Sequence, residues 1–134
     1  MVENKAGAAC AMLMLCVMAS GCGTEEREME ASAVAEGFLA ALEREDADVA
    51  CASLAPETLE ALVLSEGLAC EKAITEQDLP GGSVDEVVVW GDHAQARTEA
   101  DVLFLSELGD GWKVVAAGCR PQGERPYRCE VGGS

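Results

Sequence analysis

The stretch EQDLPGGSVDEVVVWG, residues 76–91, separates two parts of the chain that have different hydrophobic periods. Its first half holds a proline followed by two glycines, residues that strongly interrupt regular structure. Before it, apolar residues recur at helical spacing, and after it they alternate with polar residues as in a strand. Helices followed by consecutive strands are typical of an α+β domain. We therefore expect N-terminal helices packed on a curved antiparallel sheet.

Three helices are predicted before this stretch. The second should begin after Asp46, whose carboxylate can accept hydrogen bonds from the first helical turn. The third should begin at Pro56, which the first turn of a helix tolerates, and end at Gly67. The first helix is the longest, and its apolar stripe consists of Ala31, Val34, Ala35, Phe38, Leu39 and Leu42.

Three strands and a short return strand are predicted after the stretch. The β-branched run VDEVVVWG at 84–91 forms the first strand and ends in a tight turn at Gly91-Asp92. The alternation over 93–105 predicts one continuous second strand, and a hairpin at 109–111 leads into the third. Residues 120–126 are too rich in proline and glycine for a regular element, whereas 127–131 could pair back as a short strand.

The N-terminal residues have the features of a secretory signal peptide. Residues 6–21 carry no charge, but this run is shorter than the roughly 20 apolar residues that a membrane-spanning helix needs. The small residues Ala19, Ser20 and Gly21 directly precede Cys22. This pattern resembles the lipobox of bacterial lipoproteins, in which the cysteine receives a diacylglyceryl group and becomes the new N-terminus. The alternative is a buried N-terminal helix with an ordinary cysteine at position 22.

The lipoprotein interpretation divides the chain into three parts. We expect a signal peptide at 1–21, a lipidated polar tether at 22–28 and a single α+β domain at 29–134. From Cys22 onward the chain has 24 acidic and 8 basic residues, a net charge of −16. Phosphate backbones repel such a chain, so nucleic acid is excluded as a partner. Charge alone should not hold it on an anionic membrane either.

Four cysteines remain after Cys22, and an even number in an exported domain indicates disulfide bonds. They allow three pairings, of which sequence proximity favours Cys51 with Cys70 and Cys119 with Cys129. A zinc site is the competing explanation. The spacings lack any C-x-x-C motif, and the single histidine, His93, stands apart from the cysteines, so we expect no metal site.

Two segments carry a resemblance to a known family. The helical stretch AVAEGFLAALEREDADVACASLAPET at 33–58 and the late strand GDGWKVVAAGC at 109–119 resemble those of small secreted lipoproteins of high-GC Gram-positive bacteria. These lipoproteins have a nuclear-transport-factor-2-like, cystatin-related cone domain, and the resemblance covers most of residues 29–131. It implies that the helices and a bent sheet enclose a cone. Ketosteroid isomerase and the polyketide cyclases have related folds, and their active sites lie at the mouth of the cone.

No set of acid, base and nucleophile occurs at a usable spacing, so we predict no catalytic residues and no cofactor. Asp101 would be a pocket carboxylate if its face of the strand turns inward, and Leu103 and Leu105 are candidate ligand contacts beside it. His93 is expected on the solvated face.

We expect a noncatalytic binding or interaction domain, lipid-anchored at the extracytoplasmic face of the cell membrane. Its partner would be an envelope protein or an apolar ligand. One alternative is a cone-fold lyase or isomerase that acts on a small apolar substrate. The other is an accessory role in a membrane complex.

Overall fold

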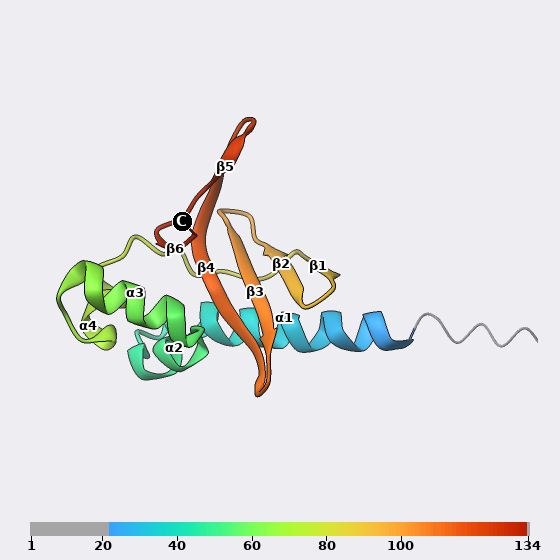
Figure 1. Ribbon diagram of the computed structural model, residues 1–134, viewed down its shortest axis with the longest axis horizontal. Helices are drawn as coiled ribbons and strands as arrows, with labels where there is room; N and C mark the ends of the chain where they lie inside the picture. Colours follow the sequence, from blue (N-terminus) through green and yellow to red (C-terminus); the bar gives the residue numbers. More distant parts are fainter. Residues whose placement is uncertain (1–21, 134) are drawn as a thin grey trace, which may run out of the picture.

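The computed structural model describes residues 22–133, in which four helices precede six strands. This order confirms the expected α+β class and the change of structure after residue 76. The expected signal peptide, 1–21, lies outside the described residues. Within 22–133 no helix combines the length and the apolar character that crossing a bilayer requires. The elements (Figure 1) are α1 (Cys22–Glu43), α2 (Ala47–Ser53), α3 (Pro56–Glu66), α4 (Cys70–Thr75), β1 (Glu86–Trp90), β2 (His93–Arg97), β3 (Val102–Leu108), β4 (Gly111–Gln122), β5 (Arg125–Arg128) and β6 (Val131–Gly132).

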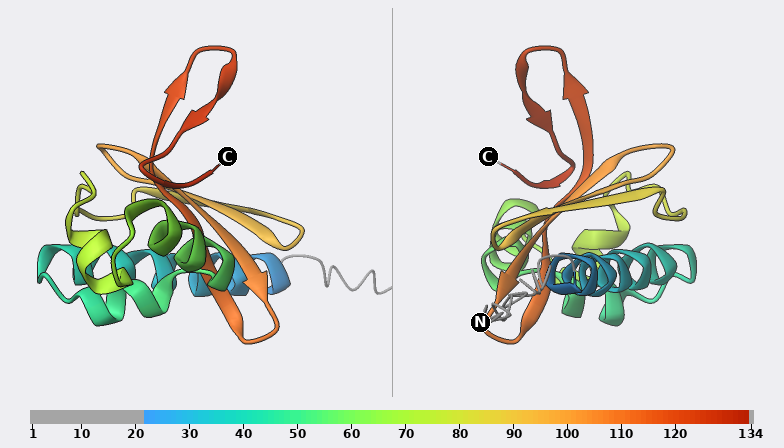
Figure 2. Two further views of the ribbon diagram at one scale, coloured as in Figure 1. Left: turned by 60° about the vertical axis from the view of Figure 1, so that its left-hand side comes forward. Right: turned by 90° about the vertical axis from the view of Figure 1, so that its right-hand side faces the viewer.

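The strands form one antiparallel sheet in the order β1-β2-β3-β4-β5, and β6 pairs with β4. Helix α1 crosses one face of this sheet and contacts β1, β2, β3 and β4 (Figure 2). The shorter helices gather near the C-terminal end of α1, and α2 packs against both α1 and α4. Side chains from all four helices join the main core on this side, so the sheet has one covered face.

Local signals place the helix boundaries where the sequence predicts them. Asp46 caps α2, and its carboxylate accepts a hydrogen bond from the amide of Val49. Helix α3 begins at Pro56 and ends at Gly67, whose φ of 65° is the left-handed conformation that glycine adopts without strain. Helix α4 is only six residues long and is not among the helices expected from the sequence.

The residues predicted to form an extended tether, 22–28, are instead the first turns of α1. Arg27 explains why this segment is ordered against the domain. Its Nε donates a hydrogen bond of 3.1 Å to Glu107 Oε2, and its guanidinium lies over the Trp112 ring, 5.4 Å from the ring centroid. These contacts hold the start of α1 against the β3–β4 hairpin.

The single strand predicted over 93–105 is in fact two strands joined by a turn at 98–101. Thr98 Oγ1 accepts hydrogen bonds from the amides of Ala100 (3.2 Å) and Asp101 (3.0 Å). The same hydroxyl lies 2.7 Å from Asp101 Oδ1, to which it donates. The turn is thus stabilised by side-chain hydrogen bonds rather than by the glycine or proline that usually marks one.

A second correction concerns the segment at 120–126, which forms a hairpin instead of an irregular loop. Strand β4 extends to Gln122 and pairs with β5 in a register that joins Arg120 to Arg128 and Gln122 to Arg125. Proline is tolerated at sheet edges and at bulges, and the β4–β5 pairing contains a register shift at the edge of the sheet. The hairpin projects away from the rest of the domain (Figures 1 and 2).

Two disulfides stabilise the domain, and they join the pairs that sequence proximity favours. Cys51–Cys70 links α2 to α4 inside the main core. Cys119–Cys129 lies on the other side of the sheet, in a smaller cluster at the base of the β4–β5 hairpin. The largest fully buried side chains of the main core are Phe38, Leu39, Ile74, Leu103, Leu105, Val114 and Val131.

Candidate functional site: the open face of the sheet

The three residues expected to face a ligand lie inside the folded domain. Leu103 and Leu105 are 0% and 1% exposed and belong to the main core, together with Phe38 and Leu39 of α1. Asp101 is 6% exposed and stabilises the turn at 98–101. A side chain without exposed surface cannot contact a ligand unless its neighbours move. The space between helices and sheet is therefore occupied by core side chains at these positions.

The opposite side of the sheet has more exposed apolar surface. In β1, Val87 and Val89 pack against the main core, so Val88 and Trp90 point to the other side, where they are 45% and 47% exposed. The strand register extends this alternation into two rows across the sheet. One row is Val88, Gln95 and Phe104, and the other is Trp90, His93 and Ser106. We call these six residues, together with Tyr127, the open face.

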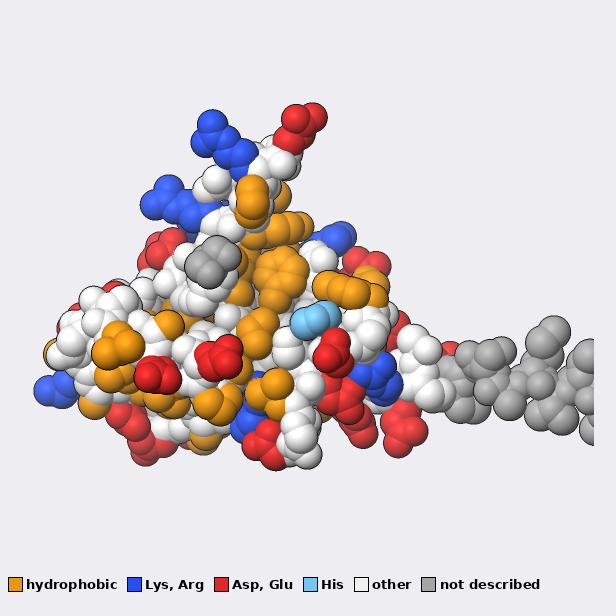
Figure 3. Space-filling view, viewed as in Figure 1, with side chains coloured by type: hydrophobic (Ala, Val, Ile, Leu, Met, Phe, Trp, Pro, Cys, Tyr) orange, Lys and Arg blue, Asp and Glu red, His pale blue; other side chains and the backbone are white. Residues whose placement is uncertain are grey.

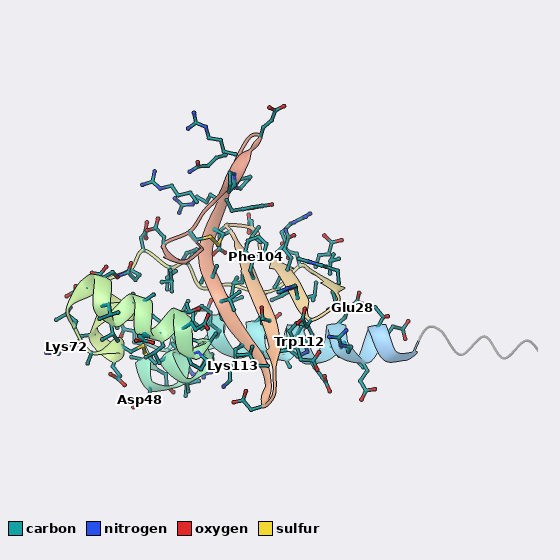
Figure 4. All side chains as sticks on the ribbon, in the orientation of Figure 1. Glu28, Asp48, Lys72, Phe104, Trp112 and Lys113 are labelled. Atoms are coloured by element: carbon teal, nitrogen blue, oxygen red, sulfur yellow. A yellow bond between two sulfur atoms is a disulfide. The ribbon has the colours of Figure 1, made fainter. Side chains whose placement is uncertain are left out.

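Aromatic contacts connect the open face to the projecting hairpin. The rings of Phe104 and Tyr127 meet edge to face, with centroids 5.2 Å apart. Figure 4 shows Phe104 near the base of the β4–β5 hairpin. In Figure 3, hydrophobic side chains gather along this side of the molecule, and the pale blue histidine, His93, lies beside them. The Cys119–Cys129 disulfide packs in the same cluster as Phe104 and so supports this surface from β4.

A chain of polar side chains also lies on the open face. His93 Nδ1 is 3.1 Å from Ser106 Oγ, and His93 Nε2 is 3.3 Å from Asp92 Oδ1. An acid, an imidazole and a hydroxyl in this order can activate the hydroxyl as a nucleophile. Sequence reasoning missed this arrangement because Ser106 is brought to His93 only by the pairing of β2 with β3.

The imidazole and the acid of this polar chain are exposed to solvent. The side chains of His93 and Asp92 are 55% and 73% exposed, so water has access to both. Catalysis by such a group normally uses a water-excluded site with donors aimed at the developing oxyanion. Among residues 22–133, no three His, Cys, Asp or Glu side chains are arranged to hold a metal ion.

Four clefts lie elsewhere on the described part of the molecule, and Asp92, His93 and Ser106 line none of them. A small cleft of about 130 Å³ lies between α1, α2 and α4. A groove of about 460 Å³ separates α3 from β6, and one of about 450 Å³ lies between α1 and β1. The fourth, of about 610 Å³, lies between the loop at 81–85 and the turn at 98–100. The polar chain is thus separate from all four clefts.

Comparisons of the chain with protein-family models, with curated proteins and with solved structures give no match.

Proposed function

We propose that the chain is a lipoprotein anchored through Cys22 at the extracytoplasmic face of the cell membrane, and that its domain binds a partner without catalysis. The uncharged run at 6–21 and the small residues before Cys22 support the anchor. The two disulfides support an oxidising compartment, because such bonds persist in exported proteins. We include in this proposal the cone-type, nuclear-transport-factor-2-like architecture that the sequence resemblance implies.

The proposal that the domain binds a partner rests on one observation. The covered face of the sheet is filled by core side chains, whereas the opposite face exposes large apolar side chains. Core residues such as Phe38 and Leu103 fill the region where a cone would hold a substrate. Exposed aromatic side chains that gather on one face are typical of contact surfaces, because aromatic residues are enriched in interfaces. The open face, with Trp90 and Tyr127 exposed by 47% and 36%, is therefore the proposed binding surface for an envelope protein or an apolar ligand.

Crosslinking in intact cells tests this surface. A photo-crosslinking amino acid replaces Val88 on the open face or, as a matched control, Leu64 on α3, which is an apolar side chain exposed by 75%. We expect discrete crosslinked products from position 88 and none of these products from position 64. Mass spectrometry then identifies the captured protein or lipid.

Two results would contradict the proposal. Identical product patterns from both positions would mean that the open face has no selective partner. Turnover of a small molecule by the purified protein, lost in both Ser106→Ala and His93→Ala, would assign the open face to an enzyme. Turnover lost only in Asp101→Asn would instead favour the lyase or isomerase alternative.

A further inference from the structure

The β4–β5 hairpin has a charge opposite to that of the rest of the domain. Residues 120–128 contain Arg120, Arg125 and Arg128 but only one acid, Glu124. The other described residues contain 23 acidic and 5 basic side chains. The hairpin is thus a cationic projection on a strongly acidic body, and an anionic partner would be attracted to this projection and repelled elsewhere.

The three guanidinium groups are free to bind such a partner. All three arginines are exposed, and the ion pairs found within the described part of the chain involve Arg27, Arg97 and His93 instead. Figure 3 shows blue basic side chains along the projecting hairpin with a red acidic one at its tip, and further red acidic side chains scattered over the body below. No described carboxylate therefore neutralises these arginines by direct contact.

The hairpin is also held in a defined position. The Cys119–Cys129 disulfide joins its two arms at the base, and Tyr127 packs edge to face on Phe104. The arginines consequently project from a braced hairpin rather than from a loose loop. A preorganised cluster of this kind loses less conformational entropy when it binds a ligand.

We propose that the β4–β5 hairpin binds the phosphate groups of anionic phospholipids in the membrane that carries the anchor. This inference rests on the proposed function, because the anchor keeps the hairpin close to the lipid. Guanidinium groups pair well with phosphate, and a tyrosine suits the interface between headgroups and acyl chains. The acidic body is repelled by the same surface, so the domain takes an orientation with the hairpin toward the membrane.

The expected gain in affinity for an anionic membrane follows from the number of arginines. Each cation near an anionic surface strengthens binding about fivefold, so three arginines give about a hundredfold. This attraction is screened by salt. The competing explanation is that the three arginines bind an acidic protein. Such binding would not depend on the charge of the lipid.

Hydrogen exchange of the full chain reconstituted in vesicles tests the proposal. One set of vesicles contains phosphatidylglycerol in phosphatidylcholine, and the other contains phosphatidylcholine alone. We expect backbone amides in 120–128 to exchange about tenfold or more slowly with phosphatidylglycerol. The variant R120Q/R125Q/R128Q should lose this protection. The variant R44Q/K72Q/R97Q removes the same number of positive charges outside the hairpin and should keep it.

Equal exchange of 120–128 in both kinds of vesicle would overturn the proposal, as would an equal loss of protection in both triple variants. Equal protection on pure phosphatidylcholine would likewise show that anionic lipid is not what the hairpin binds. Exchange is compared only for protein that floats with the vesicles. Failure of the proposed anchor therefore appears separately, as protein that does not float and as an unmodified mass of the Cys22 peptide.

Discussion

Replacing both Cys51 and Cys70 by alanine should lower the free energy of unfolding by about 3 kcal/mol or more. The bond closes a loop with a sequence separation of 19, and the loss of chain entropy in the unfolded state accounts for about 3 kcal/mol. Both cysteines are also buried in the main core, at 4% and 5% exposure, so their truncation removes packing contacts as well. Urea unfolding followed by far-UV circular dichroism measures this change.

The matched control is Cys119→Ala combined with Cys129→Ala. Its loop has a sequence separation of only 10, so the same entropy argument gives a stabilisation lower by about 0.5 kcal/mol. Cys129 also retains some exposure, in contrast to the pair in the main core. A larger loss of stability in this control than in the helical pair would contradict the account of which disulfide supports the core.

Leu103→Ala should lower the free energy of unfolding by about 3 kcal/mol, because Leu103 is 0% exposed within the main core. Trp90→Ala is the comparison on the open face. It removes a larger side chain, but one that is 47% exposed, and we expect a loss below about 1 kcal/mol. Both values come from the same urea unfolding series.

The two substitutions separate a core residue from a contact residue. If Leu103 faced a ligand cavity, Leu103→Ala would cost little stability, and the cavity would accept an apolar probe. A small effect of Leu103→Ala together with a large effect of Trp90→Ala would reverse our assignment of the two faces of the sheet.

The parts of the fold that local chemistry determines could be predicted from the sequence. Asp46, Pro56 and Gly67 mark helix ends because their side chains or backbone preferences act within one turn. The β-branched run that forms β1 gives an equally local signal. The proximity of the cysteines favoured the two disulfides, because each closes a short loop.

The parts that depend on distant residues could not be predicted. Arg27 explains the helical start of α1 through Glu107, which is 80 residues away. The turn at 98–101 switches the core-facing positions from Ala94 and Ala96 in β2 to Leu103 and Leu105 in β3. Small or apolar residues nevertheless continue at every second position from 94 to 104, and they conceal the break in the sequence pattern. The candidate site also depends on residues that are distant in the sequence, because the strand register brings Ser106 to His93.

The central claim is that cells cleave the chain before Cys22 and anchor it there by a lipid. Mass spectrometry of the protein recovered from the membrane fraction tests it most directly, with Cys22→Ser as the comparison. We predict a wild-type N-terminal peptide that begins at Cys22 and carries a diacylglyceryl group, and a Cys22→Ser protein without this modification. An unmodified Cys22 peptide within an uncleaved wild-type chain, or wild-type protein released from the membrane without lipid, would contradict the account.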